Sequence, residues 1–147
     1  MRPPLTFAVD GRPAPQGSKA YKGHRGGKPI LVEQSRYVAP WRALVAAKAR
    51  AETDDPFTTP VAVTIIFNLP RPASHYGTGR NGDVLKDSAP PLPAVRNGDI
   101  DKLARAVLDG LTGPALADDS LVVDLIAHKR YCHRSQAPGA LITIKPL

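Results

Sequence analysis

A nine-residue apolar segment flanked by prolines constrains the fold of this chain more than any other feature. Val61–Leu69 (VAVTIIFNL) is rich in β-branched residues and lies between Pro60 and Pro70. A run of this length and composition, bounded by turn-forming residues, predicts a buried β-strand. The chain is therefore expected to be built around a sheet.

Three other segments also predict strands. Leu5–Val9 (LTFAV) alternates and favours β-structure. Ser120–Cys132 (SLVVDLIAHKRYC) and Ala140–Leu147 (ALITIKPL) are longer runs of the same kind. The residues between these two, 133–139 (HRSQAPG), are typical of a hairpin connection.

Two segments predict amphipathic helices. The first begins at Pro40, a residue suited to the first helical position, and ends near Glu52. Its apolar residues recur at three- and four-residue spacing: Trp41, Leu44, Val45 and Ala49. The second starts after Asp99 and is ended by Gly113 and Pro114. Its apolar stripe consists of Ile100, Leu103, Val107, Leu108 and Leu111.

The order strand, helix, strand, helix, strand, strand predicts one α+β domain over residues 1–147. We expect a small mixed β-sheet of about four strands with two main helices packed on it. The segments 11–36 and 70–97 are rich in glycine and proline and show no apolar period, so flexible loops are expected there.

Charge points to a polyanionic partner. Lys and Arg outnumber Asp and Glu by 20 to 13, and cations that neutralise phosphates release counterions on binding nucleic acid. The candidate DNA-binding residues are Lys19, Lys22, Arg25, Lys28, Arg96, Lys102, Lys129 and Arg130. The alternatives are a solvated loop for the first four and an exposed strand end for Lys129 and Arg130.

The single cysteine, Cys132, excludes an intrachain disulfide and a cysteine-rich zinc site. No segment reaches the roughly 20 apolar residues that span a membrane. We therefore expect a cytoplasmic protein without a membrane partner.

Two aspartates, Asp99 and Asp101, stand where the second helix begins. In a structural interpretation, aspartate caps a helix and offsets the positive end of its dipole. The four-residue steps from Asp101 to Arg105 and on to Asp109 also suit a solvated ladder of ion pairs. A cap needs only one residue, however, so one carboxylate is left over.

A second acidic pair, Asp118 and Asp119, precedes the strand that starts near Ser120. Aspartate is common in turns, which is the structural interpretation. If the strand returned along the helix and the two acidic sites met, three carboxylates would converge in a basic surface. Such a group holds Mg²⁺, with Mn²⁺ as a substitute, and supports phosphodiester hydrolysis.

The stretch Asp99–Asp124 resembles the RusA family of Holliday-junction resolvases. The family pattern is D-x-D-N-L-x-K, then an apolar helix ending in L-D-x-L, then D-D-x-x-V. The residues that match it are Asp99, Asp101, Leu103, Asp109, Leu111, Asp118, Asp119, Val122 and Val123. Lys102 replaces the asparagine, and Arg105 stands in place of a catalytic lysine.

The resemblance implies a RusA-like fold and Mg²⁺-dependent resolution of four-way (Holliday) junctions or branched DNA by paired symmetric nicks. It implies a homodimer of phage or prophage type that acts in recombination and repair, in the host cytoplasm. Asp99, Asp101 and Asp119 would bind the metal and, with Arg105, form the catalytic set. Since arginine does not exchange protons near neutral pH, the role of Arg105 would be electrostatic.

Two other functions fit the same residues. One is a non-catalytic, basic DNA-binding protein of phage replication or recombination, in which the acids are caps and turn residues. The other is a protein-interaction domain of a phage replication or packaging complex. A nuclease depends on the metal whereas a binder does not, and an interaction domain would show little salt dependence of DNA binding.

Overall fold

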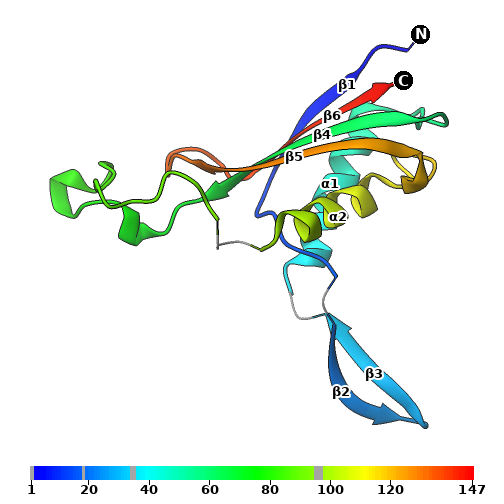
Figure 1. The fold of residues 1–147 in the computed structure, drawn as a ribbon, viewed down its shortest axis with the longest axis horizontal. Helices are drawn as coiled ribbons and strands as arrows, with labels where there is room; N and C mark the ends of the chain where they lie inside the picture. The colour runs from blue at the N-terminus through cyan, green and yellow to red at the C-terminus, as the bar shows by residue number, and fades with distance from the viewer. Residues whose placement is uncertain (1, 18, 34–35, 95–97) are drawn as a thin grey trace.

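The molecule is built on one four-stranded mixed sheet with two helices on one of its faces (Figure 1). The computed structural model describes residues 2–17, 19–33, 36–94 and 98–147. Its sheet strands are β1 (Leu5–Asp10), β4 (Val61–Pro70), β5 (Val122–Cys132) and β6 (Gly139–Pro146), and its helices are α1 (Val38–Glu52) and α2 (Ile100–Leu111). The predicted α+β class and four-stranded sheet are confirmed.

The proline-flanked segment is a central strand, as its composition predicts. Side chains of β4 alternate between buried and half-buried along all ten residues. β4 pairs antiparallel with β6 and parallel with β5, and β1 continues the sheet beyond β6. The alternating residues Val61, Val63, Ile65, Phe67 and Leu69 thus form the sheet side of the core.

The helices complete this core, although each stripe differs from the prediction at one position. Trp41, Val45 and Ala49 of α1 are buried, but Leu44 is 44% exposed where α1 passes Gly11 and the edge strand β1. In α2, Leu103, Val107 and Leu111 are buried, whereas Ile100 is 38% exposed in the first turn. The helix pair crosses at Gly110, where an added Cβ would lie 2.9 Å from Val45.

The predicted hairpin between the last two strands is wrong. β5 and β6 do not pair, because β4 lies between them in the strand order β1-β6-β4-β5. The connection after Cys132 therefore passes over the end of β4. This arrangement leaves β5 as an edge strand.

The loop predicted over 11–36 contains a second, two-stranded sheet. β2 (Lys19–Arg25) and β3 (Lys28–Glu33) form an antiparallel hairpin, which we call the basic hairpin. Gly26 and Gly27 turn the chain with φ of 59° and 77°. Two positive φ angles are what a tight two-residue hairpin turn requires, which is the physical reason for the correction. The flexibility of the segment stays a prediction.

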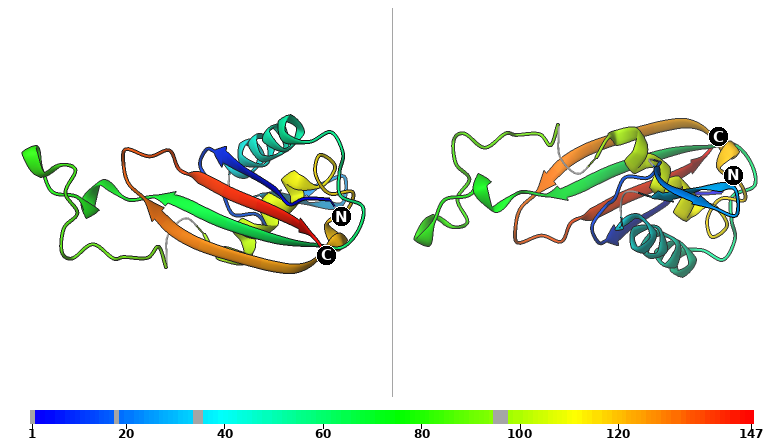
Figure 2. Two further views of the ribbon diagram at one scale, coloured as in Figure 1. Left: turned by 90° about the horizontal axis from the view of Figure 1, so that it is seen from above. Right: turned by 90° about the horizontal axis from the view of Figure 1, so that it is seen from below.

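The segment after β4 leaves the sheet as a projection, residues 71–94, which we call the arm (Figure 2). It holds two short 3₁₀ turns, η1 (Ala73–His75) and η2 (Gly79–Asn81). The arm folds back on itself through an antiparallel bridge between Tyr76 and Leu85 and a 2.9 Å hydrogen bond from Lys86 N to the His75 carbonyl. A third turn, η3 (Asp119–Leu121), precedes β5. No helix in the described ranges is long and apolar enough to cross a membrane.

Candidate active site

The acid pair, Asp99 and Asp101, lies at the start of α2 in an open position. Asp99 occupies the N-cap position with extended backbone, yet its side chain accepts no capping hydrogen bond. Its carboxylate is 75% exposed and lies 3.7 Å from the ammonium of Lys102. Asp101, in the first helical turn, is exposed as well. No capping hydrogen bond forms at Asp99, and both exposed aspartates lie at the positive end of the helix dipole.

Arg105 follows one turn later on the same helix and is exposed. Its guanidinium lies against the chain at Gly17, where an added Cβ would come within 2.5 Å of Nη1. Among the described ion pairs, Arg105 has no acidic partner, so the predicted ladder from Asp101 to Asp109 does not form. The guanidinium is thus left one helical turn from the acid pair, available to an anion.

Asp109 is held by a residue outside the helix. Gln16 Nε2 donates a hydrogen bond to the Asp109 carboxylate, and Gln16 Oε1 accepts one of 2.9 Å from Arg42. The Gln16 backbone N–H also donates to the Lys102 carbonyl at 3.0 Å. Gln16 therefore fastens the root of the basic hairpin onto α2, next to the acid pair.

On the other side, β5 supports the residue before the acid pair. Lys129 Nζ donates to the Gly98 carbonyl at 3.1 Å and to the Ala94 carbonyl at 3.3 Å. The ammonium thus ties the end of the arm and the approach to Asp99 to the sheet. The sequence predicts a DNA contact for Lys129, whereas in the structure its ammonium donates hydrogen bonds to two backbone carbonyl oxygens.

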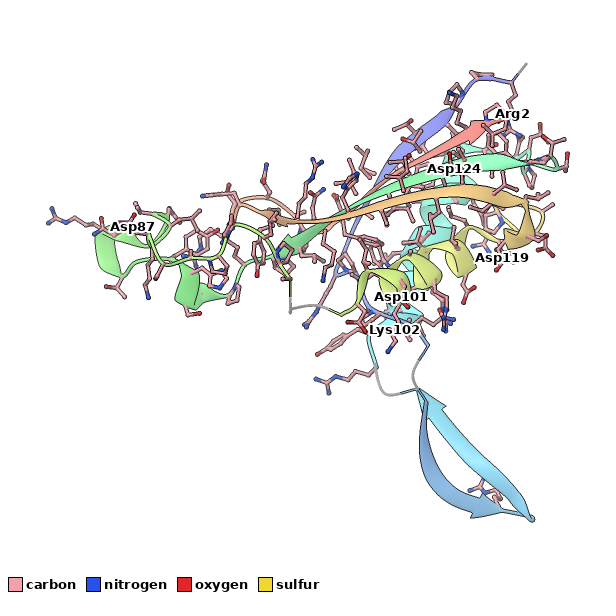
Figure 3. All side chains as sticks on the ribbon, in the orientation of Figure 1. Arg2, Asp87, Asp101, Lys102, Asp119 and Asp124 are labelled. Atoms are coloured by element: carbon pink, nitrogen blue, oxygen red, sulfur yellow. The ribbon has the colours of Figure 1, made fainter. Side chains whose placement is uncertain are left out.

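Asp118 and Asp119 lie at the far end of α2. Figure 3 shows Asp101 and Asp119 near opposite ends of the helix, and twelve residues of helix span about 18 Å. Within the described residues, no group of three or more His, Cys, Asp or Glu side chains is arranged to hold a metal. The predicted convergence of three carboxylates is therefore absent within one copy of the chain.

The two residues of that second pair differ in role. The Asp118 carboxylate accepts a 2.8 Å hydrogen bond from Ser120 N, which lowers the pKa of Asp118 and caps η3. The turn interpretation thus holds for Asp118. Asp119 is exposed and lies in the first turn of η3.

The described residues among those predicted to bind DNA lie on the basic hairpin, α2 and β5. Lys19 and Lys22 lie on β2, and Arg25 and Lys28 pair across the tip of the basic hairpin, where Arg25 is exposed. Lys102 is next to Asp99, and Arg130 is exposed on β5. Arg96 lies outside the described residues. Lys102 therefore lies beside the acid pair, whereas the basic hairpin extends away from α2 (Figure 1).

Two residues that organise this region gave no signal as site residues in the sequence. Gln16 sits in a Pro- and Gly-rich stretch without a period, and its contact with Asp109 spans 93 positions. Arg71, which is stacked 4.3 Å from the Tyr131 ring, belongs to the unpatterned start of the arm. Long-range contacts of this kind leave no local spacing to detect.

Comparison with known proteins agrees with this arrangement. Residues 10–145 match the family model described as endodeoxyribonuclease RusA. The chain is also similar to the uncharacterised protein YqaN of Bacillus subtilis (strain 168), with 30% identity over 143 residues, which cover 96% of this chain and 95% of that protein. The chain belongs to the RusA family of Holliday-junction-resolving endodeoxyribonucleases.

Proposed function

We propose that this protein is a Mg²⁺-dependent endodeoxyribonuclease that resolves four-way DNA junctions by paired nicks, acts in the cytoplasm, and uses the acid pair as its metal site. The observation that carries the proposal is the state of Asp99 and Asp101: two exposed carboxylates, one residue apart, that are not consumed by capping. Buried apolar residues of α2 hold their backbone in place, so the carboxylates are positioned while their side chains stay exposed.

The donor set fits magnesium. Mg²⁺ is a hard cation that keeps several waters and binds through one or two carboxylates together with substrate phosphates. When bound, the ion would activate a water and neutralise charge that develops on the phosphate. Asp99 and Asp101 would hold it, and Mn²⁺ would substitute because it accepts the same oxygen ligands.

Arg105 supplies a fixed positive charge beside the scissile phosphate in this proposal. Its five N–H donors match phosphate oxygens, and it cannot serve as proton donor or acceptor near neutral pH. Gly17 leaves room for the guanidinium, since a Cβ there would overlap it. Lys102, 3.7 Å from the Asp99 carboxylate, orients that acid and adds charge for the DNA backbone.

We also propose that the protein acts as a homodimer in which β5 of one copy pairs antiparallel with β5 of the other. β5 is an eleven-residue edge strand with three exposed apolar residues in its first half: Val123 by 64%, Leu125 by 43% and Ile126 by 49%. Long apolar edges of this kind are templates for pairing with another strand. A two-fold axis at β5 makes the contact self-complementary and closed.

This dimer would also give Asp119 a place in the site. In an antiparallel pair, the start of the partner's β5 lies opposite the end of the first β5. The end of β5 lies next to the acid pair, because Lys129 of this strand donates a hydrogen bond to the carbonyl of Gly98, the residue before Asp99. The partner subunit's Asp119 would then approach Asp99 and Asp101, so that each metal site is completed across the two-fold axis.

The alternative function, a basic DNA-binding protein without activity, is favoured by one observation. No three-acid group is preformed in the described part of a single chain. A binder of this kind would keep its DNA affinity unchanged when the acids are replaced or the divalent ion is removed.

Metal binding and assembly test the proposal together. Mn²⁺ binding is measured as the decrease in the paramagnetic resonance signal of free Mn²⁺. Asp99→Asn and Asp101→Asn should each abolish this binding. Asp87→Asn, which changes an exposed acid of the arm, should retain it. Val123→Lys with Leu125→Lys should convert dimers to monomers in sedimentation, whereas Leu92→Lys, equally exposed at 64%, should not. Equal Mn²⁺ binding by the three acid variants would refute the acid-pair site.

A further inference from the structure

The arm has features that a solvated insertion does not need. Arg71 near its start donates a 2.7 Å hydrogen bond to the Pro90 carbonyl near its end and stacks 4.3 Å from the Tyr131 ring. His75 is only 9% exposed and packs edge-on against the same ring. The two limbs of the arm are therefore joined to each other and to β5.

A second arginine fixes the outer part. Arg134, after β5, lies 4.9 Å from the Tyr76 ring centroid, donates to the Gly82 carbonyl and lies 3.8 Å from the Asp83 carboxylate. Its backbone N–H donates to the Tyr76 hydroxyl at 3.1 Å. The projection is thus held in one direction by contacts with the sheet.

The arm carries exposed cationic side chains that have no partner among the described residues. Arg80 at the η2 tip and Lys86 on the returning limb are exposed, and within the described residues their side chains have no hydrogen-bond or ion-pair partner. Arg130, on β5 near the root of the arm, is exposed and unpaired in the same sense. Asn81, beside Arg80, offers a carboxamide.

The end of the arm lies beside the acid pair. Lys129 bonds the Ala94 carbonyl at the end of the arm and the Gly98 carbonyl that precedes Asp99. In Figures 1 and 3 the arm and the basic hairpin leave this region in different directions, with Asp101 between their roots. A linear duplex is straight on this scale, with a persistence length of about 150 base pairs, whereas the duplex limbs of a branched DNA diverge from one point.

We propose that the arm is a second DNA-binding element, in which Arg80 and Lys86 contact the phosphates of one duplex limb while the basic hairpin follows another. This inference rests on the proposed function, because it takes branched DNA as the substrate. The contacts of the arm would then contribute to the preference of the protein for branched DNA over linear DNA.

The test compares Arg80→Ala/Lys86→Ala with Arg50→Ala/Lys145→Ala, a pair that removes the same charge from exposed positions on α1 and β6. Both are made in an Asp101→Asn background, so that affinity for a four-way junction and for a linear duplex of equal length is measured without cleavage. Circular dichroism checks that both variants fold. Mg²⁺-dependent cleavage by the protein with native acids is followed in parallel, so failure of the proposed function is seen separately.

We expect the arm variant to lose affinity for the junction more than for the duplex. Its slope of log affinity against log salt should fall by about two, one for each phosphate contact removed. The inference is overturned if the arm variant matches the control pair in affinity and slope, or if both DNAs are weakened equally.

Discussion

The ammonium nitrogen of Lys129 lies 3.1 Å from the carbonyl oxygen of Gly98, the residue that precedes Asp99. A strand in the sheet thereby holds the backbone on which the acid pair depends. The parallel pairing of β5 with β4 places Lys129 opposite the fully buried Phe67, so the anchor is attached to the core strand of the sheet.

Lys129→Met keeps most of the length of the side chain and removes this anchor. We expect the Mg²⁺ concentration for half-maximal cleavage to rise several-fold, because the acid pair loses its support, while DNA affinity changes little. Cleavage rates over a Mg²⁺ titration measure this. Arg130→Met is the control and should weaken DNA binding without moving the Mg²⁺ requirement. Identical behaviour of the two variants would mean that Lys129 is only a DNA contact.

Gln16 is expected to stabilise the fold through its bonds to Asp109 and Arg42. Hydrogen bonds to charged groups are worth about 1.5–3 kcal/mol, and partial exposure reduces this, so Gln16→Ala should cost about 1–2 kcal/mol. Denaturant unfolding measures the loss, with Ser88→Ala at an exposed position of the arm as the control. A double-mutant cycle with Asp109→Ala should show a coupling energy; strict additivity would contradict the contact.

Cys132 is expected to be a poorly reactive thiol in the native protein. Burial raises the pKa of Cys132, so less of it is thiolate at a given pH. Labelling by a thiol reagent should be slow near neutral pH and should reach its midpoint at higher pH than in the unfolded chain. Since the pKa is higher in the folded state, this group stabilises the fold below the ordinary thiol range and loses that contribution as pH rises. Equal labelling rates of folded and unfolded protein would contradict the burial of this strand end.

Mixing two inactive variants tests whether sites are shared between copies. A mixed dimer contains one Asp101→Asn chain and one Asp119→Asn chain. If the sites are built across the two-fold axis, one of its two sites combines native Asp101 from one chain with native Asp119 from the other and is intact. We expect such mixtures to nick single strands of a junction. If each site lies within one chain, every site carries a substitution, and the mixture stays as inactive as its parents.

Much of the fold follows from local patterns. The β4 segment, the alternation in β1 and the apolar periods of both helices predict elements whose bounds lie within a few residues of those observed. The basic hairpin does not follow from a local pattern, because its strands are basic and glycine-rich and lack an apolar period, although Gly26 and Gly27 suit a tight turn. Strand order is not local: nothing in the residues after Cys132 indicates that β4 separates β5 from β6.

Some residues of the candidate site also follow from local spacing, and others depend on long-range contacts. Asp99, Asp101 and Arg105 lie within two turns of one helix, so their spacing was enough to bring them together. Asp119 is separated from them by the length of α2, and its approach depends on how a second copy docks. Gln16 and Lys129 act through contacts that span many positions, which no spacing in the chain could have indicated.

The most direct test of the acid pair is cleavage of an end-labelled four-way junction, mapped on all strands, in Mg²⁺ and in EDTA, by the native protein and by Asp101→Asn. Linear duplex is the control substrate. We predict symmetric nicks on two opposed strands that require both Mg²⁺ and Asp101. A junction that is bound tightly by the native protein but stays intact in every divalent ion would contradict the nuclease assignment for this chain.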